Sequence, residues 1–301
     1  MARLLGMAAV QMEPVANDPA ASVAKIGALT AEIARSFPWV QLVMFHELAA
    51  SGAVPFAPTE TPDAWRQTAQ PIPGPLTDQL CAIARQTGKW LVPGSLYELD
   101  GDRIYNTALA ISPAGAIVAR YRKLFPWLPF EDGTTAGDEF CVFDIPDVGR
   151  FGLCICYDQW FPEVARTLTW LGAEVILQPT MTPTSDRALE LVVSQATAIF
   201  NQCYFVGLNG LSPLGGGRSL IVDPDGRVLQ QAGDHATILT EVLDLDHVTR
   251  TREFGTLGLT QSLKQLRDSG RQFPIYQQGV AQGEGFKRLG PLAIHRQLRL
   301  P

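Results

Sequence analysis

The sequence predicts an α/β protein, because segments typical of buried strands alternate with segments typical of amphipathic helices along most of the chain. Two further observations support this class. The order strand, helix, strand of the opening residues returns in residues 151–208, although no sequence repeat accompanies it. Several strands are also continuous apolar runs, which are typical of strands buried on both faces. We therefore expect two halves with the same element order.

Composition limits the functional classes. The chain has 301 residues, of which 46% are hydrophobic and 18% charged, so it can bury a large core. A net charge of −6 offers no basic surface for a nucleic-acid backbone. The five cysteines are an odd number, which argues against a closed disulfide framework and favours a reducing compartment. No apolar run reaches the ~18 residues of a membrane span, so we expect a cytoplasmic protein with no membrane or nucleic-acid partner.

The first half opens with a strand, a helix and a second strand. Leu4–Met12 is apolar and lacks a clear small-residue cleavage site, so we predict a buried strand and not a signal peptide. Asp18, followed by a proline, is a typical helix N-cap. The apolar run Gln41–Phe45 stops abruptly at His46 and Glu47, which places this polar pair at the carboxyl end of a buried strand.

The later elements are predicted from helical spacing, β-rich runs and turn residues. They are a helix at Pro75–Gln86; strands at Trp90–Tyr97, Tyr105–Ile111 and Ala116–Tyr121; a loop at Lys123–Asp138; a strand at Phe151–Cys156; a helix at Pro162–Leu171; a strand at Glu174–Gln178; a helix at Asp186–Asn201; a strand at Cys203–Leu208; a hairpin of Arg218–Val222 and Arg227–Gln231; and a strand at Thr237–Leu243.

The chain changes character near residue 250. From there glycines separate short segments, and the end is basic, with His295, Arg296 and Arg299 among its last residues. We predict one domain over residues 1–250, followed by an arm over residues 251–301. Composition alone leaves open whether this arm is disordered or wraps a neighbouring subunit.

The densest chemical signal surrounds Cys156, which lies where the predicted strand Phe151–Cys156 gives way to a helix beginning near Pro162. At such a junction, backbone N–H groups and the positive end of the helix lower a thiol pKa and face a developing oxyanion. We expect Cys154 to share a strand face with Cys156 but to lie away from the junction. Cys156 is therefore the candidate nucleophile, and we interpret the other cysteines as small buried hydrophobic residues.

A cysteine nucleophile needs a base, and a histidine is the first candidate. The chain has four histidines, of which we expect His235, His247 and His295 to lie on the surface. His46 adjoins Glu47, and neighbours on a strand point to opposite faces, so only one of the two can face a common site. A carboxylate can replace the imidazole if burial raises its pKa. This reasoning leaves open whether Glu47 or His46 is the base that serves Cys156.

Signals for a metal or a phosphate-binding loop are weak. The pair Cys154 and Cys156 has no second pair, and the histidines do not cluster. Gly215–Ser219 lacks the lysine and the strand–loop–helix context of a phosphate loop. We expect chemistry that needs neither a metal nor an organic cofactor.

Three motifs in register resemble the nitrilase superfamily of carbon–nitrogen hydrolases. Glu47 follows an apolar strand, Lys123 ends a Tyr-Arg-Lys segment after a strand, and Cys156 begins Cys-Tyr-Asp with Phe-Pro-Glu163 shortly beyond it. The resemblance covers roughly the first 250 residues. It implies a four-layer αββα sandwich of two similar halves that dimerises, and a Glu-Lys-Cys triad.

The resemblance also implies a role for each matching residue. Glu47 matches the general base, Lys123 the lysine beside the oxyanion, and Cys156 the nucleophile. Tyr157 supplies a backbone N–H to the oxyanion, and Glu131 matches a second glutamate that positions substrate in aliphatic amidases and formamidases. Candidates for the wall of the substrate pocket are Trp127, Phe130, Tyr157, Trp160, Phe161 and Met181.

The residues around the nucleophile separate branches of the superfamily. Nitrilases usually carry Cys-Trp-Glu, so Cys-Tyr-Asp158 favours amides over nitriles. The segment Asp158–Glu163 is similar to N-carbamoylputrescine amidohydrolases, whereas Pro126–Glu131 is similar to aliphatic amidases and formamidases. We expect an amidohydrolase that cleaves a primary amide of a small or medium carboxylic acid to the acid and ammonia through a cysteine thioester.

Other functions remain as alternatives to this expectation. Hydrolysis of an N-carbamoyl amine is the first of them, and a nitrilase or a non-catalytic binding module follow. A binding module has no physical need to keep Glu47, Lys123 and Cys156 together. The small-molecule amide is the expected partner of a homodimer or higher homo-oligomer, because each half of the sandwich leaves a helical layer to be covered.

Overall fold

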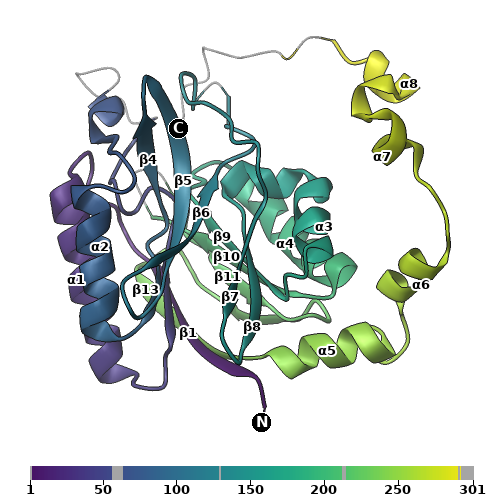
Figure 1. The fold of residues 1–301 in the computed structure, drawn as a ribbon, viewed down its shortest axis with the longest axis horizontal. Coiled ribbons are helices and arrows are strands. Elements are labelled where there is room, and N and C mark those ends of the chain that lie inside the picture. Colours follow the sequence, from purple (N-terminus) through teal and green to yellow (C-terminus); the bar gives the residue numbers. More distant parts are fainter. Residues whose placement is uncertain (1, 56–63, 129, 212–214, 291, 293–301) are drawn as a thin grey trace.

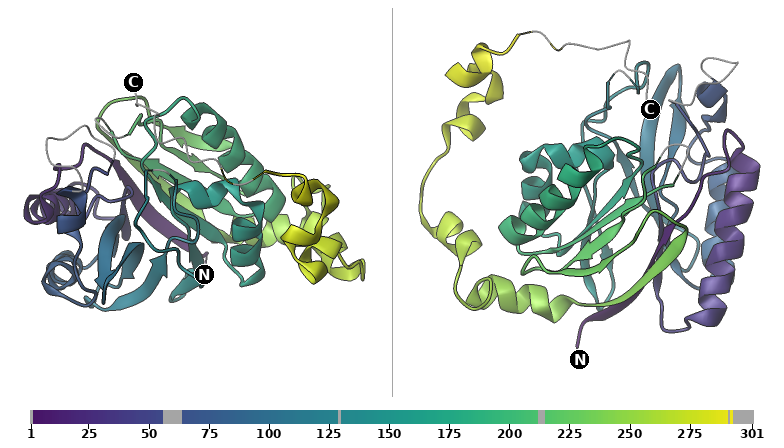
Figure 2. Two further views of the ribbon diagram at one scale, coloured as in Figure 1. Left: turned by 90° about the horizontal axis from the view of Figure 1, so that it is seen from above. Right: turned by 180° about the vertical axis from the view of Figure 1, so that it is seen from behind.

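A computed structural model describes residues 2–55, 64–128, 130–211, 215–290 and 292. Two β-sheets lie face to face, and a pair of helices covers the outer face of each sheet (Figures 1 and 2). The predicted αββα sandwich is therefore confirmed. The first sheet and its helices come mainly from the first half of the chain, and the second sheet and its helices from the second half.

The first sheet combines parallel and antiparallel strands. Helices α1 (Pro19–Ser36) and α2 (Pro75–Thr87) cover its outer face, and a short helix η1 (Ala64–Thr68) precedes α2. In spatial order its strands are β13 (Thr237–Asp244), β1 (Leu4–Gln11), β2 (Leu42–Phe45), β3 (Trp90–Val92), β5 (Arg103–Ile111) and β4 (Ser95–Asp100), with β6 (Ile117–Arg122) also paired to β5.

The second sheet carries α3 (Pro162–Trp170) and α4 (Arg187–Asn201) on its outer face. Strands β8, β9 and β10 run parallel at its centre. In spatial order the strands are β12 (Val228–Gln231), β11 (Leu220–Val222), β10 (Tyr204–Asn209), β9 (Val175–Thr180), β8 (Gly149–Leu153) and β7 (Cys141–Ile145).

The alternating directions of side chains along the central strands explain how the layers pack together. Successive side chains of a strand point to opposite faces. In β2, Val43 and Phe45 pack toward α1 and α2, whereas Leu42 and Met44 pack into the core between the sheets. All four residues are completely buried. The apolar run of the sequence is thus a strand buried on both faces, as predicted.

Several local predictions are confirmed. Helix α1 begins at Pro19, and the Asp18 side chain accepts a hydrogen bond from the Ala21 N–H at 2.9 Å. The predicted hairpin turn follows β11, where one Asp223 carboxylate oxygen accepts from the N–H groups of Asp225 and Arg227. Each cap satisfies backbone N–H groups that would otherwise lack partners.

Two strand predictions were wrong in their extent, and one strand was missed. The segment Trp90–Tyr97 forms two strands, because Gly94 between them has a φ of +79° and packs against the His46 carbonyl, where a Cβ would lie 1.8 Å from the oxygen. Strand β7 was not predicted. Strand β8 ends at Leu153 and not at Cys156, so Cys154 and Cys156 do not share the face of a strand.

The C-terminal arm follows α5 (Leu245–Phe254), which packs on the core through Leu245 and Val248. Helices α6 (Ser262–Asp268), α7 (Pro274–Gln278), η3 (Val280–Gln282) and α8 (Glu284–Lys287) then run around the outside of α3 and α4 and bury no residue of their own (Figure 2). Residues His295, Arg296 and Arg299 lie outside the described residues. In the described part of the chain, no helix is long and apolar enough to span a membrane.

Candidate active site

Four of the predicted site residues meet at one edge of the sandwich. Glu47 lies two residues beyond β2, Lys123 directly follows β6, and Cys156 lies three residues beyond β8. Carboxyl ends of parallel strands collect at one edge of a sheet, which is where α/β proteins place their sites. These three residues and Glu131 are at most 5% exposed and line one cavity.

The Lys123 ammonium lies at the centre of this group. Its Nζ is 2.9 Å from Oε1 of Glu47 and 2.5 Å from Oε2 of Glu131. Burial lowers the pKa of Lys123, but the charges of Glu131 and Glu47 outweigh it and raise that pKa well above its ordinary value. The side chain is therefore a fixed positive charge inside the protein.

Asn106 on β5 holds the two carboxylates in place from the other side. Its Nδ2 donates to Oε1 of Glu47 at 2.8 Å and to Oε1 of Glu131 at 2.9 Å. The backbone N–H of Trp127 donates to Oε2 of Glu131 at 2.6 Å. Both oxygens of Glu131 are thus engaged, which fixes the orientation of this carboxylate without any ligand.

The backbone around Cys156 forms a tight turn. Cys156 has a φ of +48° at the start of helix η2 (Cys156–Trp160), a left-handed conformation that is uncommon for a residue other than glycine. Asp158 stabilises the turn by accepting from the Ile155 N–H at 2.8 Å and from the Tyr121 hydroxyl at 2.7 Å. The Phe125 N–H donates to the same carboxylate at 3.0 Å. Asp158 therefore joins the nucleophile turn to the segment that carries Lys123.

The electrostatics of the thiol differ from the sequence prediction. Burial, followed by the charge of Glu47, raises the pKa of the Cys156 thiol well above its ordinary value, although Lys123 lowers it. The predicted lowering of the thiol pKa is wrong, because Cys156 begins the five-residue helix η2 and not α3, and burial outweighs the nearby positive charge. Burial, with a contribution from Glu131, also raises the pKa of Glu47 to about 7. The structure thus places a neutral thiol beside a carboxylate that exchanges its proton near neutral pH.

A second buried polar chain approaches Cys156 from the side of β9 and α4. The Thr182 hydroxyl lies 3.8 Å from Sγ of Cys156 and donates to Oε1 of Glu190 at 3.0 Å. Arg187 donates to the other oxygen of Glu190 at 2.9 Å. Thr182 therefore directs its hydroxyl proton to Glu190. The lone pairs of the hydroxyl oxygen remain to accept a hydrogen bond from the Cys156 thiol.

The other predicted pocket residues separate into two groups. Trp127 and Met181 line the cavity with Glu47 and Cys156, and Tyr157 and Trp160 line its extension toward Asp186 and Glu190. Phe130 packs against Trp127, with ring centroids 4.5 Å apart. The prediction for Phe161 was wrong, because its ring stacks on Phe125 at 3.6 Å and packs into the core under α3 and α4.

His46 does not line the cavities that contain Cys156 in the described structure. Its Nδ1 lies 2.8 Å from the Glu47 carbonyl oxygen, and its ring packs against Gly210. Burial lowers the pKa of His46 to about 4. Of the two arrangements that sequence reasoning left open, the geometry favours Glu47 as the base. His235 is exposed as predicted, whereas His247 is half-buried against Asp225.

Sequence reasoning missed Asn106, Thr182, Glu190 and Tyr97. Asn106 carried one available signal, because asparagine is disfavoured inside a β-rich run. Glu190 occupies an ordinary position in a helix, and its partnership with Thr182 depends on the tertiary fold. Tyr97 matches the apolar pattern of its strand, so nothing in the sequence distinguishes it from a core residue.

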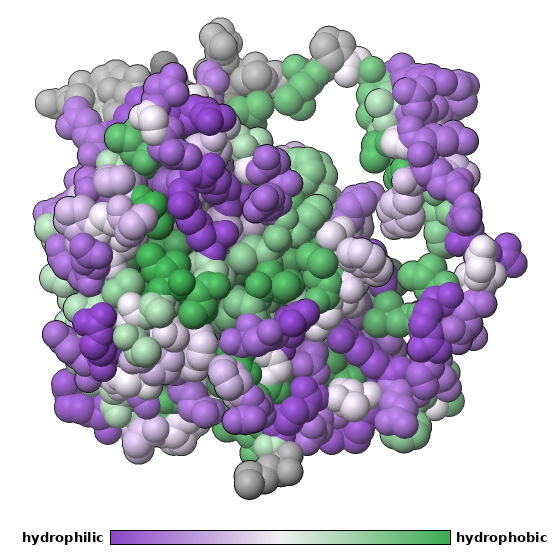
Figure 3. Space-filling view, in the orientation of Figure 1, coloured by the Kyte–Doolittle hydropathy of each residue, from purple (hydrophilic) through white to green (hydrophobic). Residues whose placement is uncertain are grey.

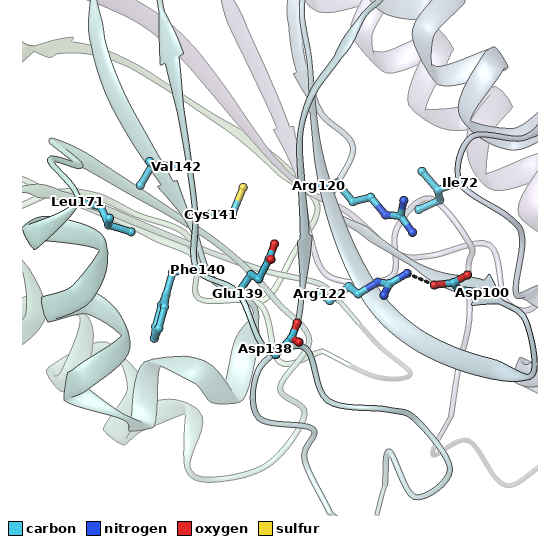
Figure 4. A pocket seen from close by; sticks show the side chains of 10 residues that line it. All are labelled: Ile72, Asp100, Arg120, Arg122, Asp138, Glu139, Phe140, Cys141, Val142 and Leu171. Atoms are coloured by element: carbon cyan, nitrogen blue, oxygen red, sulfur yellow. Dashed lines mark hydrogen bonds and ion pairs between the residues drawn. The ribbon is translucent and has the colours of Figure 1, made fainter. Parts of the chain in front are cut away.

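A larger open cavity of about 660 Å³ lies elsewhere, between β6 and β7. Its wall includes Arg120, Arg122, Asp100, Asp138 and Glu139 (Figure 4). Both arginines pair with the buried carboxylate of Glu98, and Arg122 also pairs with Asp100 at 2.6 Å. This cavity contains none of the predicted site residues.

Comparison with known proteins identifies the family. Residues 6–253 match the model of the carbon-nitrogen hydrolase family, so the chain belongs to this family and is a hydrolase of carbon–nitrogen bonds. The predicted nitrilase superfamily, in its amidase-like branch, is confirmed.

Individual relatives are moderately similar. The chain is 31% identical to the omega-amidase NIT2 of Mus musculus over 66% of this chain and 76% of that protein. It is 34% identical to a nitrilase of Pyrococcus abyssi over 77% and 86% of the respective chains. Among solved structures, a mutant amidase from Nesterenkonia sp. AN1 in complex with butyramide has a TM-score of 0.72, at 24% identity over 84% of this chain and 95% of that chain. Saccharomyces cerevisiae Nit3 has a TM-score of 0.71, at 24% identity over 83% and 94%.

The charge of Glu47 makes a prediction for the thiol. Replacing Glu47 by glutamine removes the negative charge that raises the pKa of Cys156, so that pKa falls. The measurement is the midpoint of the pH dependence of alkylation by iodoacetamide, followed on the Cys156 peptide by mass spectrometry. Glu163→Gln, outside both cavities, is the matched control and leaves the midpoint unchanged. A midpoint in Glu47→Gln that stays the same or rises contradicts the geometry.

Proposed function

We propose that the protein is an amidohydrolase that cleaves a primary amide of a small or medium carboxylic acid to the acid and ammonia through a thioester on Cys156. One observation carries the proposal: Glu47, Lys123, Glu131 and Cys156 come from three separate segments and line the same buried cavity. A nucleophile, a base with a pKa near 7 and a fixed cation are the groups that acyl transfer requires.

Acylation begins with a proton transfer. Glu47 takes the thiol proton as Sγ of Cys156 attacks the carbonyl carbon of the amide. The carbonyl oxygen becomes an oxyanion, which Lys123 and the backbone N–H of Tyr157 stabilise; one such donor is typically worth about 10²- to 10³-fold in rate. Because the resting thiol is neutral, attack and proton transfer are coupled, and the enzyme does not hold a free thiolate.

Acylation is complete when the tetrahedral intermediate collapses, the C–N bond breaks, and Glu47 gives its proton to the departing ammonia. Deacylation uses the same groups. Glu47 then activates a water molecule, which attacks the thioester and releases the acid and the Cys156 thiol. Glu131 orients the amide group and keeps Lys123 in place through its 2.5 Å contact with Nζ.

Two observations favour an amide over a nitrile as the substrate. Tyr157 and Asp158 follow the nucleophile where nitrilases usually carry Trp and Glu. The chain is also similar to omega-amidases at 30–31% identity, although a relative named nitrilase is 34% identical. We further propose a cytoplasmic location, which the five free cysteines favour.

Substrate turnover tests the proposal. Ammonia release is measured from a panel of primary amides, nitriles and N-carbamoyl amines. We expect turnover of primary amides that falls at least about 10³-fold in Cys156→Ala. Cys154→Ala is the matched control, because Cys154 is equally buried but packs under α3, and it retains activity.

Two outcomes of this panel would reject the proposal. Turnover confined to N-carbamoyl amines or to nitriles would assign a different substrate class. Absence of turnover on the whole panel, with a thiol at Cys156 that does not react with iodoacetamide, would favour a binding module.

We also propose that α3, α4 and the arm over residues 251–301 form a subunit interface. Exposed apolar side chains gather on the two helices, where Trp170 is 81% exposed, Val192 63% and Phe200 64%. The arm helices bury no residue within their own chain, and an open gap separates part of the arm from the body (Figure 3). Contiguous exposed apolar surface of this kind marks association sites.

Light scattering tests this interface. We expect the native chain at twice its 32.8 kDa mass or more, and we expect Phe200→Glu to yield a species of lower mass because it places a charge in the apolar contact. Val118→Glu is the control, since Val118 is 44% exposed on β6 and lies on the other sheet. A native chain that is monomeric at micromolar concentration would refute the proposal.

A further inference from the structure

The cavity beside Cys156 contains one polar group that the mechanism does not use. Tyr97 on β4 lines this cavity together with Glu47, Lys123 and Cys156, and its side chain is completely buried. Its hydroxyl has no hydrogen-bond partner among the residues that the structure describes. A buried hydroxyl without a partner destabilises the folded protein, so such a group in a native structure calls for an explanation.

The ring of Tyr97 is held firmly by its neighbours. It packs on Trp65 with ring centroids 4.6 Å apart and belongs to an apolar cluster with Leu48 and Met181. Its backbone carbonyl accepts from the Gln70 N–H at 3.0 Å. The hydroxyl of this rigidly held ring can therefore bind a substrate atom without the entropic cost of ordering the side chain.

The surroundings of the hydroxyl define what it can bind. Burial, followed by the charges of Glu131 and Glu47, raises the pKa of Tyr97 well above its ordinary value, so the hydroxyl stays protonated and remains a donor. Two carboxylates and one ammonium share the cavity, so a negatively charged acyl chain is disfavoured there. The wall formed by Leu48, Met181 and Pro55 is otherwise apolar.

We propose that the Tyr97 hydroxyl determines specificity by donating a hydrogen bond to an uncharged acceptor oxygen in the acyl chain of the substrate. This inference rests on the amide hydrolysis proposed above. It narrows the substrate class to primary amides whose chain carries a hydroxyl, an ether or a second carbonyl oxygen. A site built around a hydrogen bond discriminates against an analogue that lacks the group, because its own polar atom is then left unpaired.

A set of amides of equal length tests the inference. Pentanamide is the apolar reference, and 2-ethoxyacetamide, 3-methoxypropanamide and 4-hydroxybutanamide place one oxygen at successive positions of the same chain. The value of kcat/KM is measured for each amide with the native enzyme and with Tyr97→Phe. The control is Tyr204→Phe, which removes another mostly buried hydroxyl, one that lies 3.3 Å from the Asp244 carbonyl oxygen outside the cavity.

The expected result is a preference that depends on the hydroxyl. The native enzyme favours at least one oxygen-containing amide over pentanamide, and Tyr97→Phe reduces that ratio about tenfold, the value of one hydrogen bond. Tyr97→Phe retains its turnover of pentanamide, which shows that the variant is folded and competent. Tyr204→Phe leaves all ratios unchanged.

The other outcomes overturn the inference in distinguishable ways. Equal losses on all four amides in Tyr97→Phe would assign the hydroxyl to the reacting amide group and not to the acyl chain. Unchanged values of kcat/KM for all four amides would show that the hydroxyl has no part in recognition. If the native enzyme hydrolyses none of the amides while Cys156 remains reactive toward iodoacetamide, the proposed function itself fails, and the inference fails with it.

Discussion

The site depends on one buried ion triad, the Lys123 ammonium held between Glu47 and Glu131. Removing a charge from water costs several kcal/mol unless a partner compensates it, and loss of one partner of a buried pair destabilises a protein by about 3–5 kcal/mol. Asn106 supplies the remaining donors to both carboxylates. Burial keeps the pKa of Glu47 near 7, because it outweighs the attraction of Lys123 and the charge of Glu131 adds to it.

Burial, followed by the charge of Glu47, explains the state of the Cys156 thiol. A thiolate buried beside Glu47, with Glu190 on its other side, is disfavoured, so the raised pKa keeps Cys156 protonated. On the proposed mechanism, the enzyme differs from thiol hydrolases that hold a preformed thiolate beside a charged histidine. Its reactivity then depends on the proximity of a base, a nucleophile and a cation that three strand ends bring together.

Sequence patterns predicted the features that depend on interactions between residues close together in the sequence. The Asp18 cap, the strand of Leu42–Phe45 and the turn at Asp223 each depend on neighbours in the sequence. Motif order and strand ends also predicted that Glu47, Lys123 and Cys156 lie together, and these residues line one cavity. The turn at Cys156 could not be predicted, since cysteine carries no signal for a positive φ and Asp158 fixes the turn through Tyr121, which lies 37 residues away. The contact of Asn106 with Glu47 spans 59 residues, and single-sequence patterns contain no information on such pairs.

Direct observation of the acyl-enzyme tests the central claim, which is covalent catalysis by Cys156. The enzyme is mixed with an amide that it hydrolyses, quenched in acid within milliseconds and digested, and the peptides are weighed by mass spectrometry. The account predicts that the peptide containing Cys156 gains the mass of the substrate minus ammonia, and that the adduct disappears as the substrate is exhausted. Ammonia release with no adduct on Cys156, or with an adduct on another residue, would contradict it.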